Sequence, residues 1–337
     1  MTALVMTVTE TLRYRGAIGQ WSWVLHRITG LGVVLFLTLH VIDTSWAVFY
    51  PEKYVEAIAT YQSPLFTLGE FGLIACVIYH AINGLRIALL DNRPHLWQYQ
   101  QRAAYIVLAI TGIILIPVFI LMFSHVLEFY NSGEPFLPLA DVLAGQVPFI
   151  GGFAAAAIAA LLYSVIHGVI AGDTESKAVG RHSGSSVERF WWSFMRISGL
   201  LIVPLVFGHL AMMHILQGVF DITAQGHTVV GTGGIVNQSG TAVEFVANRW
   251  NLLVGGVAIW RIYDFLLLAL VVLHGFNGLR YVLTDYTMSS PLLRRASVYL
   301  CVIAGVTLLA LGTGALLGTI DQTAIEMAQE AAASLHP

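Results

Sequence analysis

The chain has 337 residues, of which 57% are hydrophobic and only 10% are charged, and its formal net charge is −3. Soluble domains usually carry about 25% charged residues, so the composition excludes a soluble protein and predicts an integral membrane protein. The cysteines, Cys76 and Cys301, lie in apolar runs without a CxxCH motif. This pattern argues against a disulfide framework, a covalently attached c-type haem and a four-cysteine iron–sulfur cluster.

Seven apolar segments are long enough to cross a membrane, because a spanning helix needs about 20 mainly apolar residues. In chain order they lie at 22–46, 66–90, 104–128, 149–172, 193–219, 258–284 and 296–319. Each span is expected to be α-helical, since lipid offers no partner for open backbone hydrogen bonds. The N-terminal stretch shows no secretory signal pattern. The predicted fold class is therefore all-α integral membrane, with seven transmembrane helices.

The positive charges are distributed unevenly among the connecting segments. With the N-terminus inside, 13 of the 16 lysines and arginines fall on the inner side, and Lys53, Arg249 and Arg261 fall on the outer side. The positive-inside rule then places the N-terminus in the cytoplasm and the C-terminus outside. The inner set is Arg13, Arg15, Arg27, Arg86, Arg93, Arg102, Lys177, Arg181, Arg189, Arg196, Arg280, Arg294 and Arg295. The acidic tail can form a short surface helix.

The chain contains an internal repeat. Residues 70–91 and 264–285 are identical at 11 of 22 positions, and LHRITG at 25–30 matches FMRISG at 194–199. We therefore predict two parallel three-helix repeats, each beginning at the cytoplasmic side. The fourth span returns the chain to the cytoplasm between them. The predicted division is 1–130 for the first repeat, 131–175 for the outer loop and connecting helix, 176–320 for the second repeat and 321–337 for the outer tail.

Four histidines occupy repeat-equivalent positions inside the spans. They are His40, His80, His209 and His274. Ionisable residues are costly in a membrane, so a functional role is favoured over a hydrogen-bonded structural one. Neutral imidazole is a good axial ligand of haem iron, and the pattern predicts haem b held between pairs of histidines. Gly84 and Gly278, four residues after a histidine, would let a flat macrocycle approach the backbone.

Other polar residues in the spans leave alternatives open. Arginines toward the inner helix ends can neutralise haem propionates or reach lipid headgroups; they are Arg27, Arg86, Arg196 and Arg280. His214 competes with His209 as the ligand of the fifth span, although it lies about 140° around a regular helix. His125 and His167 have no repeat partner and are predicted to be structural. Glu70 and Asp264 are predicted to cap helices rather than release protons.

Three motifs carry a resemblance to a known family. They are HRITG at 26–30, the box from His80 through Gly84 and Arg86 to Asp91, and His274 followed eleven residues later by Asp285 and Tyr286. The combination resembles the cytochrome b membrane anchor of succinate dehydrogenase or fumarate reductase, respiratory complex II. The sequence looks like both three-helix anchor subunits of that complex fused in one chain. Members of the family carry no, one or two haems, so both one and two haems remain open here.

The resemblance implies roles for individual residues. His80 and His274 would ligate the haem nearer the cytoplasm, and His40 and His209 a second haem nearer the outer face. The cofactor-binding set implied is His40, His80, His209, His274, Arg86 and Arg280. A quinone, menaquinone or ubiquinone, would bind at the inner side to Ser22, His26, Arg27 and Tyr286. The catalytic residues implied are Arg27, Asp285 and Tyr286, because a quinone needs hydrogen-bond donors at its carbonyl oxygens and a proton path to water.

The sequence thus predicts a haem b-containing anchor of succinate:quinone oxidoreductase in a prokaryotic cytoplasmic membrane. It would pass electrons between the iron–sulfur subunit and a quinone. Flavin chemistry would belong to the flavoprotein subunit, because the chain has no strand-linked GxGxxG loop. Two alternatives are the cytochrome b subunit of another respiratory dehydrogenase, such as formate dehydrogenase or hydrogenase, and a haem-free transporter with parallel repeats. A b-type spectrum of the purified protein would remove the transporter.

Overall fold

The computed structural model describes residues 17–133, 139–171 and 185–335, and these residues are almost entirely helical. Seven helices are long and apolar enough to cross a membrane, which confirms the seven predicted spans. They are α2 (Ile18–Phe49), α4 (Pro64–Asn92), α5 (Gln100–Ser132), α7 (Val147–Ala171), α8 (Ser186–Leu210), α10 (Ile259–Tyr286) and α11 (Pro291–Leu317). Of the counted cations, Arg13, Arg15, Lys177 and Arg181 lie outside the described residues. The chain is a multi-pass membrane protein.

The helix ends follow local sequence signals. α4 and α11 both begin with a proline, at Pro64 and Pro291, where the missing N–H leaves no hydrogen bond unmade. Ser290 precedes α11, and its hydroxyl accepts a hydrogen bond from the backbone N–H of Leu293 at 3.3 Å. Gly133 follows the last residue of α5 and has a φ of 75° that favours glycine.

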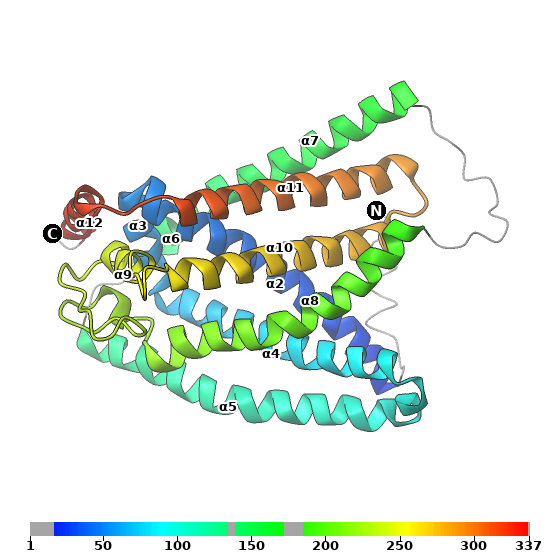
Figure 1. The fold of residues 1–337 in the computed structure, drawn as a ribbon, viewed down its shortest axis with the longest axis horizontal. Coiled ribbons are helices and arrows are strands. Elements are labelled where there is room, and N and C mark those ends of the chain that lie inside the picture. Colours follow the sequence, from blue (N-terminus) through cyan, green and yellow to red (C-terminus); the bar gives the residue numbers. More distant parts are fainter. Residues whose placement is uncertain (1–16, 134–138, 172–184, 336–337) are drawn as a thin grey trace.

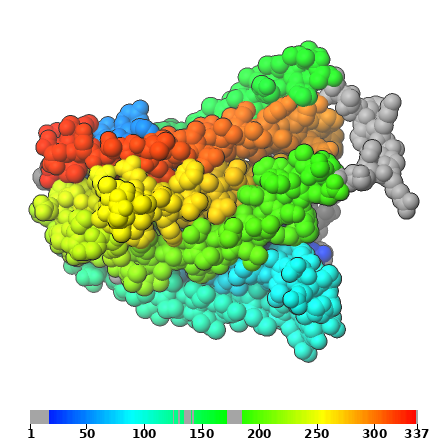
Figure 2. Space-filling view, viewed as in Figure 1, coloured from blue at the N-terminus to red at the C-terminus, as the bar shows by residue number. Residues whose placement is uncertain are grey.

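Four helices form a ring in the centre of the molecule: α2 contacts α4, α4 contacts α8, α8 contacts α10, and α10 contacts α2. α5 packs outside against α4 and α2, and α11 packs outside against α10 and α2. α7 packs on α11 at the edge of the bundle, as Figures 1 and 2 show. The connecting helix is therefore peripheral, and the two halves of the chain meet through the ring.

Short helices cover one end of the bundle, at the left of Figure 1. They are α3 (Pro51–Tyr61), α9 (Ala242–Trp250) and α12 (Gln322–Leu335), with the loop 217–241 between α8 and α9. α12 packs on α3 and α9, which confirms a helix in the C-terminal tail. We call this end the cap end. The opposite end, which carries Arg27, Asp91, Arg196 and Asp285, is called the arginine end.

Two expectations about local structure are wrong. Glu70 and Asp264 cap no helix, because α4 begins at Pro64 and α10 at Ile259 and neither helix has an acidic residue in its first turn. The fifth span is not a regular α-helix to residue 219. α8 changes at Ala211 into the π-helix η2 (Ala211–Leu216). A π-turn bonds residues five apart instead of four, so the side chains after His209 point in directions that an ideal helix does not predict.

Close packing of the ring against α11 gives a stability prediction. A Cβ atom added at Gly312 would lie 2.7 Å from Leu268 Cδ2 and 3.0 Å from Val41 Cγ1, whereas one at Gly72 has no heavy atom within 4 Å. Overpacking costs about 1–3 kcal/mol, so Gly312→Val should lower the thermal unfolding temperature of the purified protein in detergent. Gly72→Val is the matched control and should leave it unchanged. Equal melting temperatures for both variants would contradict the packing described here.

Candidate functional site

The sequence NGLR occurs at 83–86 and again at 277–280. Each of these NGLR boxes bonds the helix that carries it to the spanning helix before it in the same half of the chain. In the first repeat, the Arg86 guanidinium donates to Ser22 Oγ and to Asn83 Oδ1, both at 2.8 Å. Ser22 Oγ in turn donates to Asn83 Oδ1 at 2.8 Å, and Asn83 is fully buried. These bonds join α2 to α4. The predicted quinone ligand Ser22 therefore lies inside a helix–helix contact.

The second repeat uses the equivalent residues with a different partner. Arg280 Nε donates to Asn277 Oδ1 at 3.0 Å, and Arg280 Nη1 donates to Glu188 Oε1 of α8 at 3.1 Å. Glu188 thus performs in α8 the role that Ser22 performs in α2. Packing between helices therefore accounts for the repetition of the asparagine and the arginine in both boxes. Neither Arg86 nor Arg280 lines the cavity between the ring helices.

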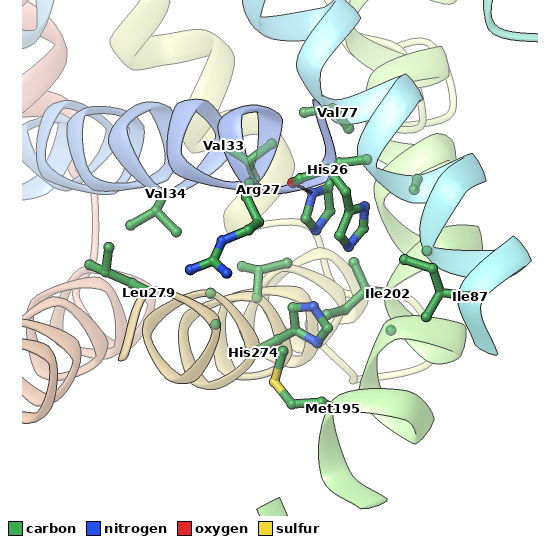
Figure 3. Close-up of a pocket in the computed structure, with 18 of the residues that line it drawn as sticks. His26, Arg27, Val33, Val34, Val77, Ile87, Met195, Ile202, His274 and Leu279 are labelled. Atoms are coloured by element: carbon green, nitrogen blue, oxygen red, sulfur yellow. Dashed lines mark hydrogen bonds between the residues drawn. The ribbon is translucent and has the colours of Figure 1, made fainter. Parts of the chain in front are cut away.

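A cavity of about 470 Å³ lies between α2, α4, α8 and α10. His80 and His274 both line it, one from each repeat, together with His26 and many apolar side chains. Figure 3 shows the rings of His26 and His274 on opposite sides of this space. A mainly apolar cavity with a few convergent polar groups is the usual form of a cofactor site.

His80 is held in a defined orientation and tautomer. Its ring stacks on that of His26, with centroids 3.9 Å apart and planes 7° apart. Its Nδ1 lies 3.0 Å from the carbonyl oxygen of His26. A carbonyl oxygen only accepts, so Nδ1 carries the proton, and Nε2 of the neutral ring keeps a free lone pair. Metal-ligating histidines are usually oriented by such a bond from the second nitrogen.

His274 is held in the same way from the second repeat. Its Nδ1 lies 2.9 Å from Ser198 Oγ, and that hydroxyl donates to the carbonyl oxygen of Met195 at 3.5 Å. When Ser198 donates there, it accepts from Nδ1–H of His274, which again leaves Nε2 free. Each histidine is therefore oriented by the first helix of its own repeat.

Glycines make room for the two histidine rings. A Cβ atom on Gly30 would lie 2.9 Å from His80 Cε1, and one on Gly199 would lie 3.4 Å from His274 Cε1. Gly30 and Gly199 are the glycines of HRITG and MRISG. Gly84 and Gly278 also line the cavity, and Cβ atoms added to them would lie 3.6 Å from His26 Cε1 and from Met195 Cε, respectively. The first pair seats the ligand histidines, and the second pair lies against other side chains of the cavity wall.

Two ion pairs at the arginine end join the repeats reciprocally. Arg27 Nη1 of α2 donates to Asp285 Oδ2 of α10 at 2.8 Å. Arg196 Nη2 of α8 donates to Asp91 Oδ2 of α4. Arg27 and Arg196 are repeat-equivalent, and so are Asp91 and Asp285. The arginine of each half therefore pairs with the aspartate of the other half.

An aromatic ring accompanies each arginine. The guanidinium of Arg27 lies 4.5 Å from the ring centroid of Trp23, and that of Arg196 lies 3.4 Å from Trp192. The ring centroid of Tyr286 also lies 5.4 Å from the Arg27 guanidinium. This contact has no counterpart at Arg196, because the position equivalent to Tyr286 in the first repeat is Asn92. Arg27 thus contacts both Asp285 and Tyr286, and the role of the three residues in a quinone site stays a prediction.

His40 and His209 meet nearer the cap end, outside the large cavity. Their ring centroids are 6.1 Å apart and their planes are 79° apart. With metal–imidazole bonds of about 2.0–2.1 Å, two rings on opposite sides of one metal ion have centroids about 6 Å apart. His209 Nδ1 is buried without a hydrogen-bond partner, and the His40 side chain is exposed although it lies in mid-helix. The pair therefore fits ligation of one metal ion.

His214 has a different neighbour. Its Nδ1 lies 3.6 Å from Glu70 Oε1, across a small cavity of about 20 Å³ that both residues line. The estimate of 140° between His209 and His214 assumed a regular α-helix and does not apply, because the π-helix intervenes. Of the other intramembrane histidines, His167 Nδ1 lies 2.6 Å from the Tyr299 hydroxyl, and the side chain of His125 lies outside the described residues.

Several residues of the site escaped the sequence reasoning. Trp23 and Trp192 do have a sequence signal, because each begins a W-x3-R-I-x-G pattern, at 23–30 and at 192–199. Extending the alignment of the repeats by two residues toward the N-terminus would have identified both tryptophans. Ser198 and Glu188 carry no such signal, because Thr29 and Gly19 stand at the equivalent positions of the first repeat. Their roles depend on contacts between helices.

The fold and the site define a multi-pass helical membrane protein with an inward-facing histidine from each half of the chain. The chain belongs to the family of succinate dehydrogenase/fumarate reductase transmembrane subunits, which it matches over residues 7–105 and 174–314. The match in two regions is the pattern expected for fused anchor subunits. The chain is accordingly the membrane anchor subunit of a succinate dehydrogenase/fumarate reductase complex, and that role implies the other complex II subunits as partners.

Curated relatives support this assignment. The chain is 36% identical to the succinate dehydrogenase 2 membrane subunit SdhC of Mycobacterium tuberculosis over 118 residues, which cover 35% of this chain and 87% of the relative. It is 30% identical to the succinate dehydrogenase hydrophobic membrane anchor subunit of Halobacterium salinarum over 29% of this chain and 75% of the relative. No solved structure gave a significant match.

The reciprocal ion pairs predict a measurable coupling between the repeats. Asp91→Asn leaves Arg196 unpaired at 29% side-chain exposure, and Arg196→Gln leaves Asp91 unpaired. Each single variant should lower thermal stability, and the double variant should lose less than the sum. The expected coupling free energy is about 0.5–3 kcal/mol. A double-mutant cycle on the purified complex measures it, and strictly additive losses would contradict the pairing.

Proposed function

We propose that the chain is a two-haem b anchor of succinate:quinone oxidoreductase, which carries electrons between the iron–sulfur subunit and a membrane quinone. The observation that carries the proposal is the cavity between the two halves of the chain. His80 and His274 line it, and both have Nδ1 engaged in a hydrogen bond. When bound, haem b supplies one-electron transfer, and the protein's part is to hold, orient and tune it.

The proposed architecture is two parallel three-helix repeats, 1–130 and 176–320, with the segment 131–175 between them and the tail 321–337 outside. The reciprocal contacts of the ring support it, because α2 meets α10 as α8 meets α4. The positive-inside rule puts the arginine end in the cytoplasm of a prokaryote and the cap end outside. The iron–sulfur and flavoprotein subunits would then dock at the arginine end.

His80 and His274 would hold the first haem in the cavity through their Nε2 atoms. The site fits because neither Nε2 has a hydrogen-bond partner among the described residues, glycines seat both rings, and the walls are mainly apolar. Arg27 and Arg196 line the cavity and can neutralise propionates. Arg86 and Arg280 act on the cofactor indirectly, because their bonds fix α4 and α10, the helices that carry the ligands.

The second haem is proposed to be held by His40 and His209, nearer the cap end. Their ring separation of 6.1 Å supports His209, rather than His214, as the partner of His40. His214 has a neighbouring carboxylate, that of Glu70. Two haems would give the chain an electron path along the bundle axis.

The quinone is proposed to bind at the arginine end beside Arg27, Asp285 and Tyr286. The Tyr286 hydroxyl donates a hydrogen bond to a quinone carbonyl oxygen, and Arg27 supplies positive charge there. The Asp285 carboxyl is 56% exposed, so it can exchange protons with water and pass them to the substrate. His26 borders the same region, while Ser22 holds α2 against α4 and thereby positions His26 and Arg27.

Haem content tests the ligand assignment. His80→Ala and His274→Ala should each abolish the same haem, and Gly30→Val should do so as well by displacing the His80 ring. His40→Ala and His209→Ala should abolish only the other haem. His167→Ala, a membrane histidine bonded to Tyr299, is the control and should keep both. Pyridine haemochrome assays of the purified complex give the count. The assignment would be disproved if His80→Ala and His274→Ala removed different haems, or if either removed the same haem as His40→Ala.

Quinone kinetics test the proposed substrate site. Tyr286→Phe removes one hydrogen bond worth about 0.5–1.5 kcal/mol, so the KM for quinone should rise about 2- to 10-fold. Tyr99→Phe changes another exposed tyrosine outside the cavity lining and should leave the KM unaltered. Steady-state assays with a soluble quinone analogue measure both. An unchanged KM in Tyr286→Phe would remove Tyr286 from the site.

A further inference from the structure

Arg249 of α9 is a buried arginine with an unusual set of partners. Only 5% of the residue is exposed. Its Nη1 lies 3.2 Å from the sulfur of Met213, and its guanidinium lies 4.5 Å from the ring centroid of Trp260. Among the described residues no carboxylate lies within ion-pair distance of it, and no oxygen accepts one of its hydrogen bonds. A guanidinium carries five N–H donors, and a sulfur atom is a weak acceptor.

A second arginine at the cap end, Arg261, has oxygen acceptors for its N–H groups. Arg261 donates from Nε to the carbonyl oxygen of Trp250 at 2.6 Å, and from Nη1 to those of Leu316 and Gly318, both at 2.6 Å. Arg261 thus ties the cap to the bundle through backbone oxygens. Arg249 makes no such bonds in the described part of the chain. Burying a charge without hydrogen-bonded partners is costly, so an anion is the partner that Arg249 lacks.

The nearest acidic group does not supply that anion. The Asp264 carboxylate accepts a hydrogen bond from Trp250 Nε1 at 2.9 Å. Burial lowers the pKa of the Arg249 guanidinium, and the Asp264 charge acts in the opposite direction. Asp264 is therefore near enough to influence Arg249 electrostatically but is not in contact with it. Arginine stays protonated in such surroundings, because its pKa in water is above about 12.

Arg249 contacts the helical segment that directly follows His209. Its partner Met213 lies in η2, four residues after His209 and directly before His214. A haem held by His209 would bring anionic groups into this mainly apolar part of the bundle. Haem b has two carboxylates, its propionates. We propose that Arg249 binds a propionate of the haem held by His40 and His209, an inference that rests on the two-haem function proposed above.

This assignment gives the two haems opposite orientations. The propionates of the haem at His80 and His274 would face Arg27 and Arg196 at the arginine end. Those of the second haem would face Arg249 at the cap end. A positive charge beside a haem disfavours its oxidised form and raises its reduction potential. Arg249 is then a positioning residue that also tunes the potential of one haem.

The experiment is a potentiometric titration of the haem spectra in the purified complex. Arg249→Gln and Arg249→Met remove the charge, and Arg249→Lys keeps it. Lys53→Gln is the matched control, because it removes a cation from the cap end at a side chain that is 56% exposed. In Arg249→Gln, the haem that is lost in His209→Ala should shift to lower potential or be lost selectively. The other haem should keep its potential, and Lys53→Gln should change neither.

The outcomes separate this inference from the proposed function. A wild-type complex with one haem, retained in His209→Ala, would overturn both. Two haems whose potentials are unchanged in Arg249→Gln and Arg249→Met would overturn only the role of Arg249. Equal shifts of both haems would also overturn it, since the effect would not be local. If both uncharged variants fail to assemble, redox-induced infrared difference spectra of Arg249→Lys decide, because this variant keeps the charge and changes the hydrogen bonds to the anion. A shifted propionate carboxylate band supports the inference, and a wild-type band overturns it.

Discussion

Two ion pairs at the arginine end, Arg27 with Asp285 and Arg196 with Asp91, hold the halves of this chain in register. Each pair joins a first helix of one repeat to a second helix of the other, and together they close the ring of α2, α4, α8 and α10. Charged groups in a membrane protein are tolerated when they find partners inside the bundle. The pairing therefore fixes which helices face the cavity, and every assignment made to the cavity depends on it.

Acidic side chains have different partners at the two ends of the bundle. At the arginine end, carboxylates of the ring helices meet arginines, as Asp285, Asp91 and Glu188 do. At the cap end, Glu70 lies beside His214, and Asp264 accepts from a tryptophan. The first arrangement creates fixed charge pairs beside an exposed surface, which suits a polar substrate and a docking partner. The second places Glu70 and His214 beside α5 and the loop 217–241, and Asp264 beside α9, without an arginine of the described residues bonded to either carboxylate.

Much of this was predictable from the sequence, because a membrane simplifies the problem. Hydropathy located all seven helices, and the repeat identified His80, His274 and Arg27 without any contact information. What failed depended on three-dimensional detail. The π-helix after His209 has no sequence signal, so the angle to His214 expected for a regular helix does not apply. Glu70 lies too deep in α4 to cap it. Ser22 is held between α2 and α4 by the NGLR box, a contact that motif spacing alone does not reveal.

The central claim is that histidines from both halves of the chain ligate haem in pairs. Near-infrared magnetic circular dichroism of the oxidised complex tests it most directly, because the charge-transfer band of a low-spin ferric haem identifies both axial ligands. The account predicts bis-imidazole ligation for every haem present. Met195 lines the same cavity as His80 and His274, so a band characteristic of histidine–methionine ligation, or a high-spin haem with an open position, would contradict it.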